Sequence, residues 1–127
     1  MIGKMPEELM DAVLETIPLY IIVVDAEDIV VGWNKPGSVD IAENILGTDV
    51  KNCHPPNILP MVEQMFSEMK SGKRETATFW HMDKEKGMKL IRYYALRNKD
   101  GKYLGCLECD EYIEDMQKIK GTKMELD

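Results

Sequence analysis

The sequence has no long hydrophobic run, no cluster of basic residues and only two histidines. No apolar segment approaches the roughly 20 residues that a transmembrane helix requires, and the first residues lack the apolar centre of a signal peptide. The 23 acidic residues outnumber the 16 basic ones and give a net charge of −7, whereas a nucleic-acid-binding surface needs clustered Lys and Arg. We therefore expect a cytoplasmic protein that contacts neither membranes nor nucleic acids.

Catalytic motifs are missing as well. The sequence contains no G-x-S-x-G, no H-E-x-x-H and no phosphate-binding glycine loop, so we expect no enzymatic activity. The three cysteines, Cys53, Cys106 and Cys109, are odd in number and irregularly spaced, which favours reduced thiols. Cys106 and Cys109 form a C-x-x-C motif, but it falls in a strand pattern that would point the two thiols to opposite faces.

The apolar patterns that are present predict an α+β domain with a five-stranded antiparallel sheet. Strand patterns, separated by turn-forming residues, lie at 19–25, 29–34, 74–82, 88–97 and 102–110. Helices are expected at 6–16, 39–46, 57–70 and 113–124. We expect one domain over 1–127, with an N-terminal helix in 1–17, a core in 18–112 and a C-terminal helix in 113–127.

The clearest helix is 57–70. Its apolar residues recur at the three- and four-residue spacing of one helix face: Ile58, Met61, Val62, Met65, Phe66 and Met69. The turn directly before it, Asn-Cys-His-Pro-Pro at 52–56, holds the only adjacent Cys-His pair of the chain. The two prolines interrupt regular structure there, so this turn is either a ligand site or a shaped entrance to the helix.

Several local motifs, taken in order, resemble the PAS domain family over about 14–116. They are Ile22-Val23-Val24-Asp25, Val31-Gly32-Trp33-Asn34, Ile45-Leu46-Gly47 and the segment from Leu96-Arg97 to Asp100-Gly101. The turn at 52–56, together with Lys-Ser-Gly-Lys at 70–73, Phe79-Trp80 and Ile91-Arg92-Tyr93, is similar to PAS domains at the carboxyl end of proteins with a hemerythrin-like domain. The resemblance implies a pocket, between the sheet and small helices, which in the family holds haem, flavin, a small acid or nothing.

The candidate site residues have two interpretations each. Cys53 and His54 are ligand-binding residues or parts of the helix entrance. His81 is an axial haem ligand if it faces inward, and a solvated or dimer-face residue if it faces outward. Arg92 binds a carboxylate ligand or haem propionate, or forms a fixed ion pair with Glu75 or Glu108 on a neighbouring strand. Large residues are expected to line the interior: Trp33, Met65, Trp80 and Tyr94.

Three functional hypotheses follow. The leading one is a non-catalytic sensory or interaction module that binds a small ligand or cofactor between the sheet and the helix at 57–70. It would dimerise through the first helix and the outer face of the sheet. The second is a haem-binding sensor of gas or redox state that uses His54 or His81 as its iron ligand. The third is a dimerisation domain whose pocket is filled by its own side chains.

Overall fold

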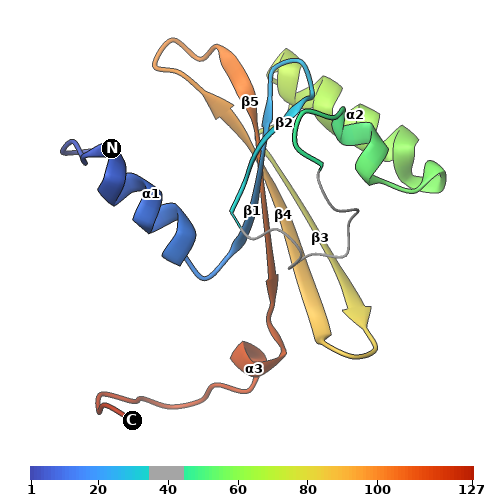
Figure 1. The fold of residues 1–127 in the computed structure, drawn as a ribbon. Coiled ribbons are helices and arrows are strands. Elements are labelled where there is room, and N and C mark those ends of the chain that lie inside the picture. The colour runs from blue at the N-terminus through green and yellow to red at the C-terminus, as the bar shows by residue number, and fades with distance from the viewer. Residues whose placement is uncertain (35–44) are drawn as a thin grey trace.

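The computed structural model describes residues 1–34 and 45–127. Its centre is a five-stranded antiparallel sheet with the strand order β2-β1-β5-β4-β3, which confirms the predicted fold class (Figure 1). The strands are β1 (Tyr20–Asp25), β2 (Val30–Trp33), β3 (Thr76–Asp83), β4 (Gly87–Arg97) and β5 (Tyr103–Tyr112). Most of the helical region predicted at 39–46 lies outside the described residues.

The described helices are α1 (Glu7–Thr16), α2 (Leu59–Ser71) and α3 (Glu114–Gln117), with two 3-10 turns, η1 (Val50–Cys53) and η2 (Pro56–Ile58). The predicted helices at 6–16 and 57–70 are confirmed. The predicted C-terminal helix is wrong beyond α3, because residues 118–127 are exposed and non-helical. Ile119 and Leu126 are 75% and 100% exposed, so no tertiary packing stabilises a helix there.

Strand pairing assigns each side chain to one of two faces, because side chains alternate along a strand. We call the face covered by α2 the inner face and the opposite one the outer face. One row of paired residues across the inner face is Trp33, Ile22, Glu108, Tyr93 and Ala77. The next row is Tyr20, Asp110, Ile91 and Phe79. Two acidic side chains therefore lie on an otherwise apolar and aromatic surface.

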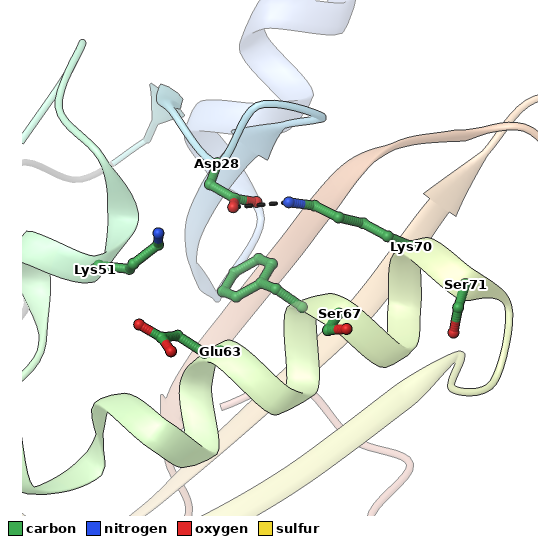
Figure 2. Close-up of a pocket in the computed structure, with 7 residues that line it drawn as sticks. Asp28, Lys51, Glu63, Ser67, Lys70 and Ser71 are labelled. Carbon is green, nitrogen blue, oxygen red and sulfur yellow. Dashed lines mark hydrogen bonds and ion pairs between the residues drawn. The ribbon is translucent and has the colours of Figure 1, made fainter.

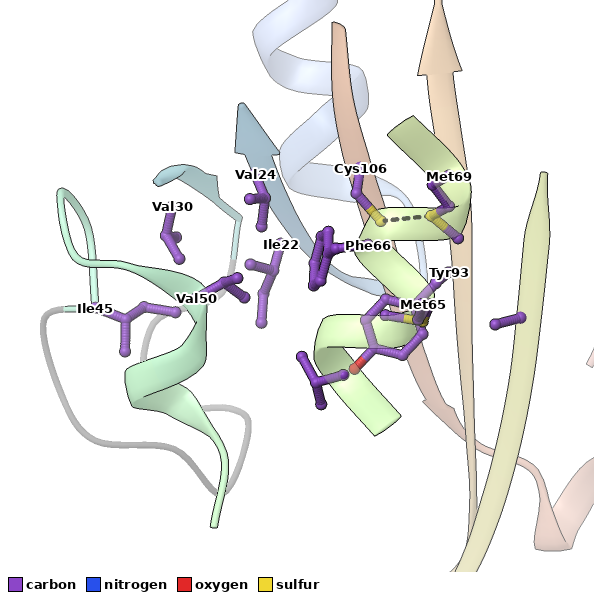
Figure 3. Close-up of a cluster of buried hydrophobic side chains, with 12 residues drawn as sticks. Ile22, Val24, Val30, Ile45, Val50, Met65, Phe66, Met69, Tyr93 and Cys106 are labelled. Carbon is purple, nitrogen blue, oxygen red and sulfur yellow. Dashed lines mark hydrogen bonds between the residues drawn. The ribbon is translucent and has the colours of Figure 1, made fainter. Parts of the chain in front are cut away.

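Helix α2 packs its apolar stripe onto the inner face. Val62, Met65, Phe66 and Met69 are buried, as predicted, whereas Met61 is 41% exposed. Figure 3 shows Phe66 and Met69 of α2 facing the strands that carry Ile22 and Cys106. The helix ends at Gly72, whose φ of 84° is the left-handed conformation that commonly terminates helices.

The segment before α2 is held against the β1–β2 hairpin by backbone hydrogen bonds. Val30 N donates to Thr48 O at 3.0 Å, and Val50 N donates to Asp28 O at 2.8 Å. The Asp49 side chain accepts from Lys51 N at 2.9 Å and caps η1. These bonds place Cys53 and His54, which close η1, beside Ile22 of the inner face.

Helix α1 lies on the other side of the sheet from α2 (Figure 1). None of its residues is buried, and its apolar side chains Leu9, Met10, Val13 and Leu14 are all more than 40% exposed. The Asn34 side chain anchors its end by donating to Leu14 O at 2.9 Å. Within the described residues, none of the helices has the length and apolar character needed to cross a lipid bilayer.

Candidate ligand-binding site

A small enclosed cavity of about 30 Å³ separates η1 from the inner face of the sheet. Its lining combines apolar side chains from β1, β2 and η1 with three polar ones, Cys53, His54 and Glu108. His54 Nδ1 lies 3.1 Å from Val50 O, which fixes the ring orientation. A cavity of this size holds one or two water-sized groups.

Asp110 and Glu108 are neighbouring acidic residues on the inner face of β5, of which Asp110 is buried and Glu108 half-buried. Asp110 is only 2% exposed, and Glu108 precedes it by two residues on the same face of the strand. Lys89 Nζ lies 3.9 Å from Asp110 Oδ2. Burial raises the pKa of Asp110 to about 8, and the neighbouring charge of Glu108 adds to the effect. Asp110 therefore carries a proton over most of the neutral pH range.

The charge of Glu108 also raises the pKa values of two neighbouring groups, Tyr93 and Cys53. The Tyr93 hydroxyl is hydrogen-bonded to Glu108, and burial followed by that negative charge raises the pKa of Tyr93. Burial first and Glu108 second also raise the pKa of the Cys53 thiol. Cys53 is thus a protonated, weakly polar wall of the cavity rather than a reactive thiolate.

Some polar atoms of this region have no protein partner. Among the described residues, Asp110 Oδ1 and Trp33 Nε1 are buried and make no hydrogen bond. An unpaired buried polar group costs about 1–3 kcal/mol, and natural proteins retain few of them. Both atoms lie on the inner face of the sheet, where each leaves a hydrogen-bonding position unfilled.

Three predicted site residues lie on the other side of the sheet. Arg92 alternates with the buried Tyr93 and faces outward, where its Nη2 donates to Glu111 Oε2 at 3.0 Å. Arg92 thus forms an ion pair, but its partner is Glu111 and not the predicted Glu75 or Glu108. Trp80 is 67% exposed on the outer face, and Tyr94 also faces outward. The prediction that these two aromatic residues line the interior is wrong.

The remaining predicted site residues lie in different environments. Met65 is buried in the core, and Trp33 packs against it, as predicted. His81 shares the inner face with Phe79 but is exposed near the β3–β4 turn, so it is solvated, as one interpretation predicted, although it does not face outward. Within the described residues, no group of three His, Cys, Asp or Glu side chains is arranged to hold a metal ion.

A second, open cleft of about 660 Å³ lies between the β1–β2 turn and α2 (Figure 2). Lys70 Nζ bridges it by an ion pair of 2.7 Å with Asp28 Oδ2, and Lys51 and Glu63 lie farther along. Asp28 Oδ1 is buried and has no hydrogen-bond partner among the described residues. The lysines, Glu63 and the serines are exposed, so water competes with any ligand there. The ion pair joins the hairpin to α2 and is a structural contact.

Sequence reasoning missed Asp110 and considered Glu108 only as a partner of Arg92. A signal was available, because both acids occupy alternate positions of a strand after Cys106, which is 1% exposed. Alternation alone places 106, 108 and 110 on one face. The burial of Asp110 depends on β1, β4 and η1, which no local pattern describes.

Comparison with known proteins gives one family match. A family model described as "PAS domain" matches residues 10–116. The C-terminal domain of a Streptococcus mutans protein is similar in structure, with a TM-score of 0.83, 25% identity and coverage of 93% of this chain and 92% of that one. A comparison with curated protein sequences gave no match.

Two more solved structures have the same fold at lower identity. The PAS domain of a Colwellia psychrerythraea protein has a TM-score of 0.61 and 13% identity, covering 85% of this chain and 97% of that one. A sensory box sensor histidine kinase from Vibrio cholerae has a TM-score of 0.56 and 11% identity, covering 83% and 89%. At these identities the likeness concerns the fold alone.

Proposed function

The chain belongs to the PAS domain family, and on this premise we propose that it is a non-catalytic sensory module that binds a small ligand at the inner face of its sheet. The observation that carries the proposal is the pair of inner-face acids Glu108 and Asp110, the first of which lines a small, mostly apolar cavity. Binding sites combine an apolar lining with a few convergent polar groups whose pKa values are shifted. A buried carboxyl oxygen without a hydrogen bond, such as Asp110 Oδ1, costs the fold stability, which favours a functional role.

The test is native mass spectrometry of the protein after incubation with a low-molecular-weight cell extract, with a UV-visible spectrum of the same sample. We expect an added mass that is retained by the wild-type protein. The matched controls are Glu108→Gln, which should lose the added mass, and Glu111→Gln on the outer face, which should keep it. A protein that stays at its apo mass in every extract would refute the ligand-binding proposal and favour the ligand-free dimerisation domain.

The haem alternative gains no support from the described residues. It needs an iron ligand and a propionate partner at one site, but Arg92 lies on the opposite face from His54 and is already paired with Glu111. His81 is exposed and separate from the enclosed cavity. A Soret band in the spectrum above, lost on His54→Ala or His81→Ala, would restore this alternative.

We also propose that the module acts as a homodimer, with α1 and the outer face of the sheet as its interface. The support is the apolar face of α1, which buries nothing within the chain, and the groove of Leu9, Ala12, Val13, Thr16, Ile17 and Pro18 beside it. Trp80 and Met82 add apolar surface on the outer face, at 67% and 57% exposure. A second copy offers the same apolar surfaces, which makes the contact self-complementary.

Val13→Lys should weaken this dimer at least about tenfold, because a lysine would be buried in an apolar contact. The monomer should still fold, since Val13 is 43% exposed. Sedimentation equilibrium measures the effect, and Asp11→Lys on the polar side of α1 is the matched control, with an unchanged dimer. A wild-type protein that sediments as a monomer at micromolar concentration would refute the dimer.

Two finer assignments belong to the proposal. The turn at 52–56 favours membership of the subgroup of PAS domains found beside hemerythrin-like domains, in which a second domain accompanies the sensor. The three free cysteines favour a reducing, cytoplasmic location. Both rest on sequence features alone.

A further inference from the structure

We propose that two copies of this chain join edge to edge along β3 and so extend their sheets into one continuous antiparallel sheet. The proposal goes beyond the proposed function, because the dimer described there uses α1 and the outer face rather than a strand edge. β3 is the last strand of the sheet, and within residues 1–34 and 45–127 it pairs only with β4 (Figure 1). An unpaired strand edge presents N–H and C=O groups to which a further strand can bind.

The hydrogen bonds of β3 show which of its backbone groups are open. Ala95 N donates to Glu75 O at 2.9 Å, so the backbone of Glu75 faces β4. Because this direction alternates along an antiparallel strand, the N–H and C=O groups of the even-numbered residues from Thr76 to Met82 face the free edge. Arg74 Nη1 lies 3.5 Å from Thr76 O, which is a long hydrogen bond that an incoming strand can replace.

The edge of β3 lacks the features that commonly block a strand edge. Residues 76–83 include no proline, lysine or arginine, and their pairing with β4 has no bulge. Trp80 and Met82 add exposed apolar side chains. The opposite edge strand, β2, has only four residues and is covered, because Val30 N donates to Thr48 O. A long open edge with apolar side chains therefore favours a partner strand at β3.

A second copy of β3 fits this edge. A two-fold axis that makes the two strands antiparallel stands perpendicular to the sheet, so both inner faces lie on the same side. Residues opposite each other then share a face, which requires a residue to lie on the axis. We call the arrangement with Thr78 on the axis the central register. In it, Ala77 lies opposite Phe79 of the second copy, and Glu75 lies opposite His81 of the second copy.

In the central register, a groove between α2 and β3 receives the Phe79 side chain of the second copy. The groove has a volume of about 170 Å³ and is lined by Met61, Gln64, Met65, Arg74, Ala77 and Phe79. The backbones of Ala77 and Phe79 face β4, so the pair that they form across the axis is not hydrogen-bonded. Side chains approach each other most closely in such pairs. The aromatic ring therefore gains an apolar contact from the second copy.

Charge complementarity favours the central register over its neighbours. Moving Phe79 onto the axis would place Glu75 of each copy opposite Asp83 of the other. Moving Trp80 onto the axis would place Glu75 beside Glu85. Like charges opposite each other destabilise a sheet. A shift in the other direction would leave most of each strand unpaired. In the central register Glu75 instead meets an imidazole.

Opposite charges at the axis test the proposal in full-length chains that also carry Val13→Lys, which removes the α1 contact of the proposed dimer. Thr78→Lys and Thr78→Glu should each weaken self-association at least about tenfold, because the central register places two like charges opposite each other. A 1:1 mixture of the two variants should restore it to within about threefold of the Val13→Lys chain, because lysine then meets glutamate. Thr78 is exposed, so both variants should fold. Sedimentation velocity over a concentration series measures the association.

The same two charges at Thr122, in the exposed C-terminal segment, are the matched control and should change self-association by less than about twofold. A Val13→Lys chain that stays monomeric at every concentration would overturn the edge contact. A mixture of the Thr78 variants that does not recover association would also overturn it. The α1 dimer has a separate readout, namely the comparison of the wild-type chain with Val13→Lys.

Amide hydrogen exchange in the Val13→Lys chain gives an independent readout. Exchange at Thr78 and Trp80, whose N–H groups face the free edge, should slow as the protein concentration rises. Ala77 and Phe79, whose N–H groups face β4, should be protected at every concentration. Exchange at Thr78 and Trp80 that does not depend on concentration, whether slow or fast, would overturn the proposal.

Discussion

The free energy of unfolding should decrease by roughly 3–4 kcal/mol between pH 5 and pH 9 through Asp110 alone. Its pKa is about 8 in the folded protein, against an ordinary value of 3.8. Between these two values the folded chain holds a proton that the unfolded chain has released, so raising the pH favours unfolding. The loss should be small near pH 4 and complete only above about pH 9.

Urea unfolding followed by circular dichroism at a series of pH values measures this dependence. Asp110→Asn should flatten the curve, because the amide can occupy the same space without titrating. Asp83→Asn is the matched control, since backbone hydrogen bonds from Lys86 and Glu85 lower the pKa of this carboxylate and it titrates below the range. A wild-type protein as stable at pH 9 as at pH 5, or an Asp110→Asn variant with the wild-type slope, would contradict the buried, protonated state of Asp110.

Gly105→Ala should destabilise the fold by about 3–5 kcal/mol or prevent folding. Gly105 has a φ of 155°, and a Cβ atom there would lie 2.1 Å from Val24 O, on the backbone of the neighbouring strand. Neither strand can move without breaking the β1–β5 ladder, in which Asp25 pairs with Gly105. Glycine is therefore required where these two backbones approach each other.

Gly101→Ala provides the matched control in thermal and urea unfolding. Gly101 has a φ of 82°, but no atom lies within 4 Å of the position that an alanine Cβ would take, so only the backbone strain of about 1 kcal/mol applies. We expect a small loss of stability for Gly101→Ala and a large loss for Gly105→Ala. Equal losses at the two positions would show that the close strand contact has no energetic role.

The order and number of strands could be predicted because turns and apolar alternation are local properties. The face of the sheet to which each strand residue points could not be predicted from the sequence. In β4 the alternating sets Ile91, Tyr93 and Leu90, Tyr94 are similarly apolar, so the sequence does not indicate which set meets the core. The wrong choice placed Trp80 and Tyr94 in the interior, although strand pairing puts them on the outer face.

The candidate site was predicted in part. The turn at 52–56 was recognised, and the structure places Cys53 and His54 at the cavity. The acidic pair was not recognised, because Asp and Glu in a strand are usually solvated. Asp110 is buried by neighbours distant in sequence, among them Tyr20 and Ile91, which pair with it. The C-terminal helix was predicted from charged residues typical of helices, but a short helix needs packing that this segment lacks.

The central claim is that the inner face of the sheet is the ligand face. The most direct test is a ¹H–¹⁵N NMR spectrum of the wild-type protein before and after addition of a low-molecular-weight cell extract. The account predicts shifts at the amides of Ile22, Val50, His54 and Glu108. The amides of Thr78 and Trp80, whose side chains point to the outer face from the edge strand β3, should not shift. Shifts confined to the outer face, or a spectrum that no extract alters, would contradict it.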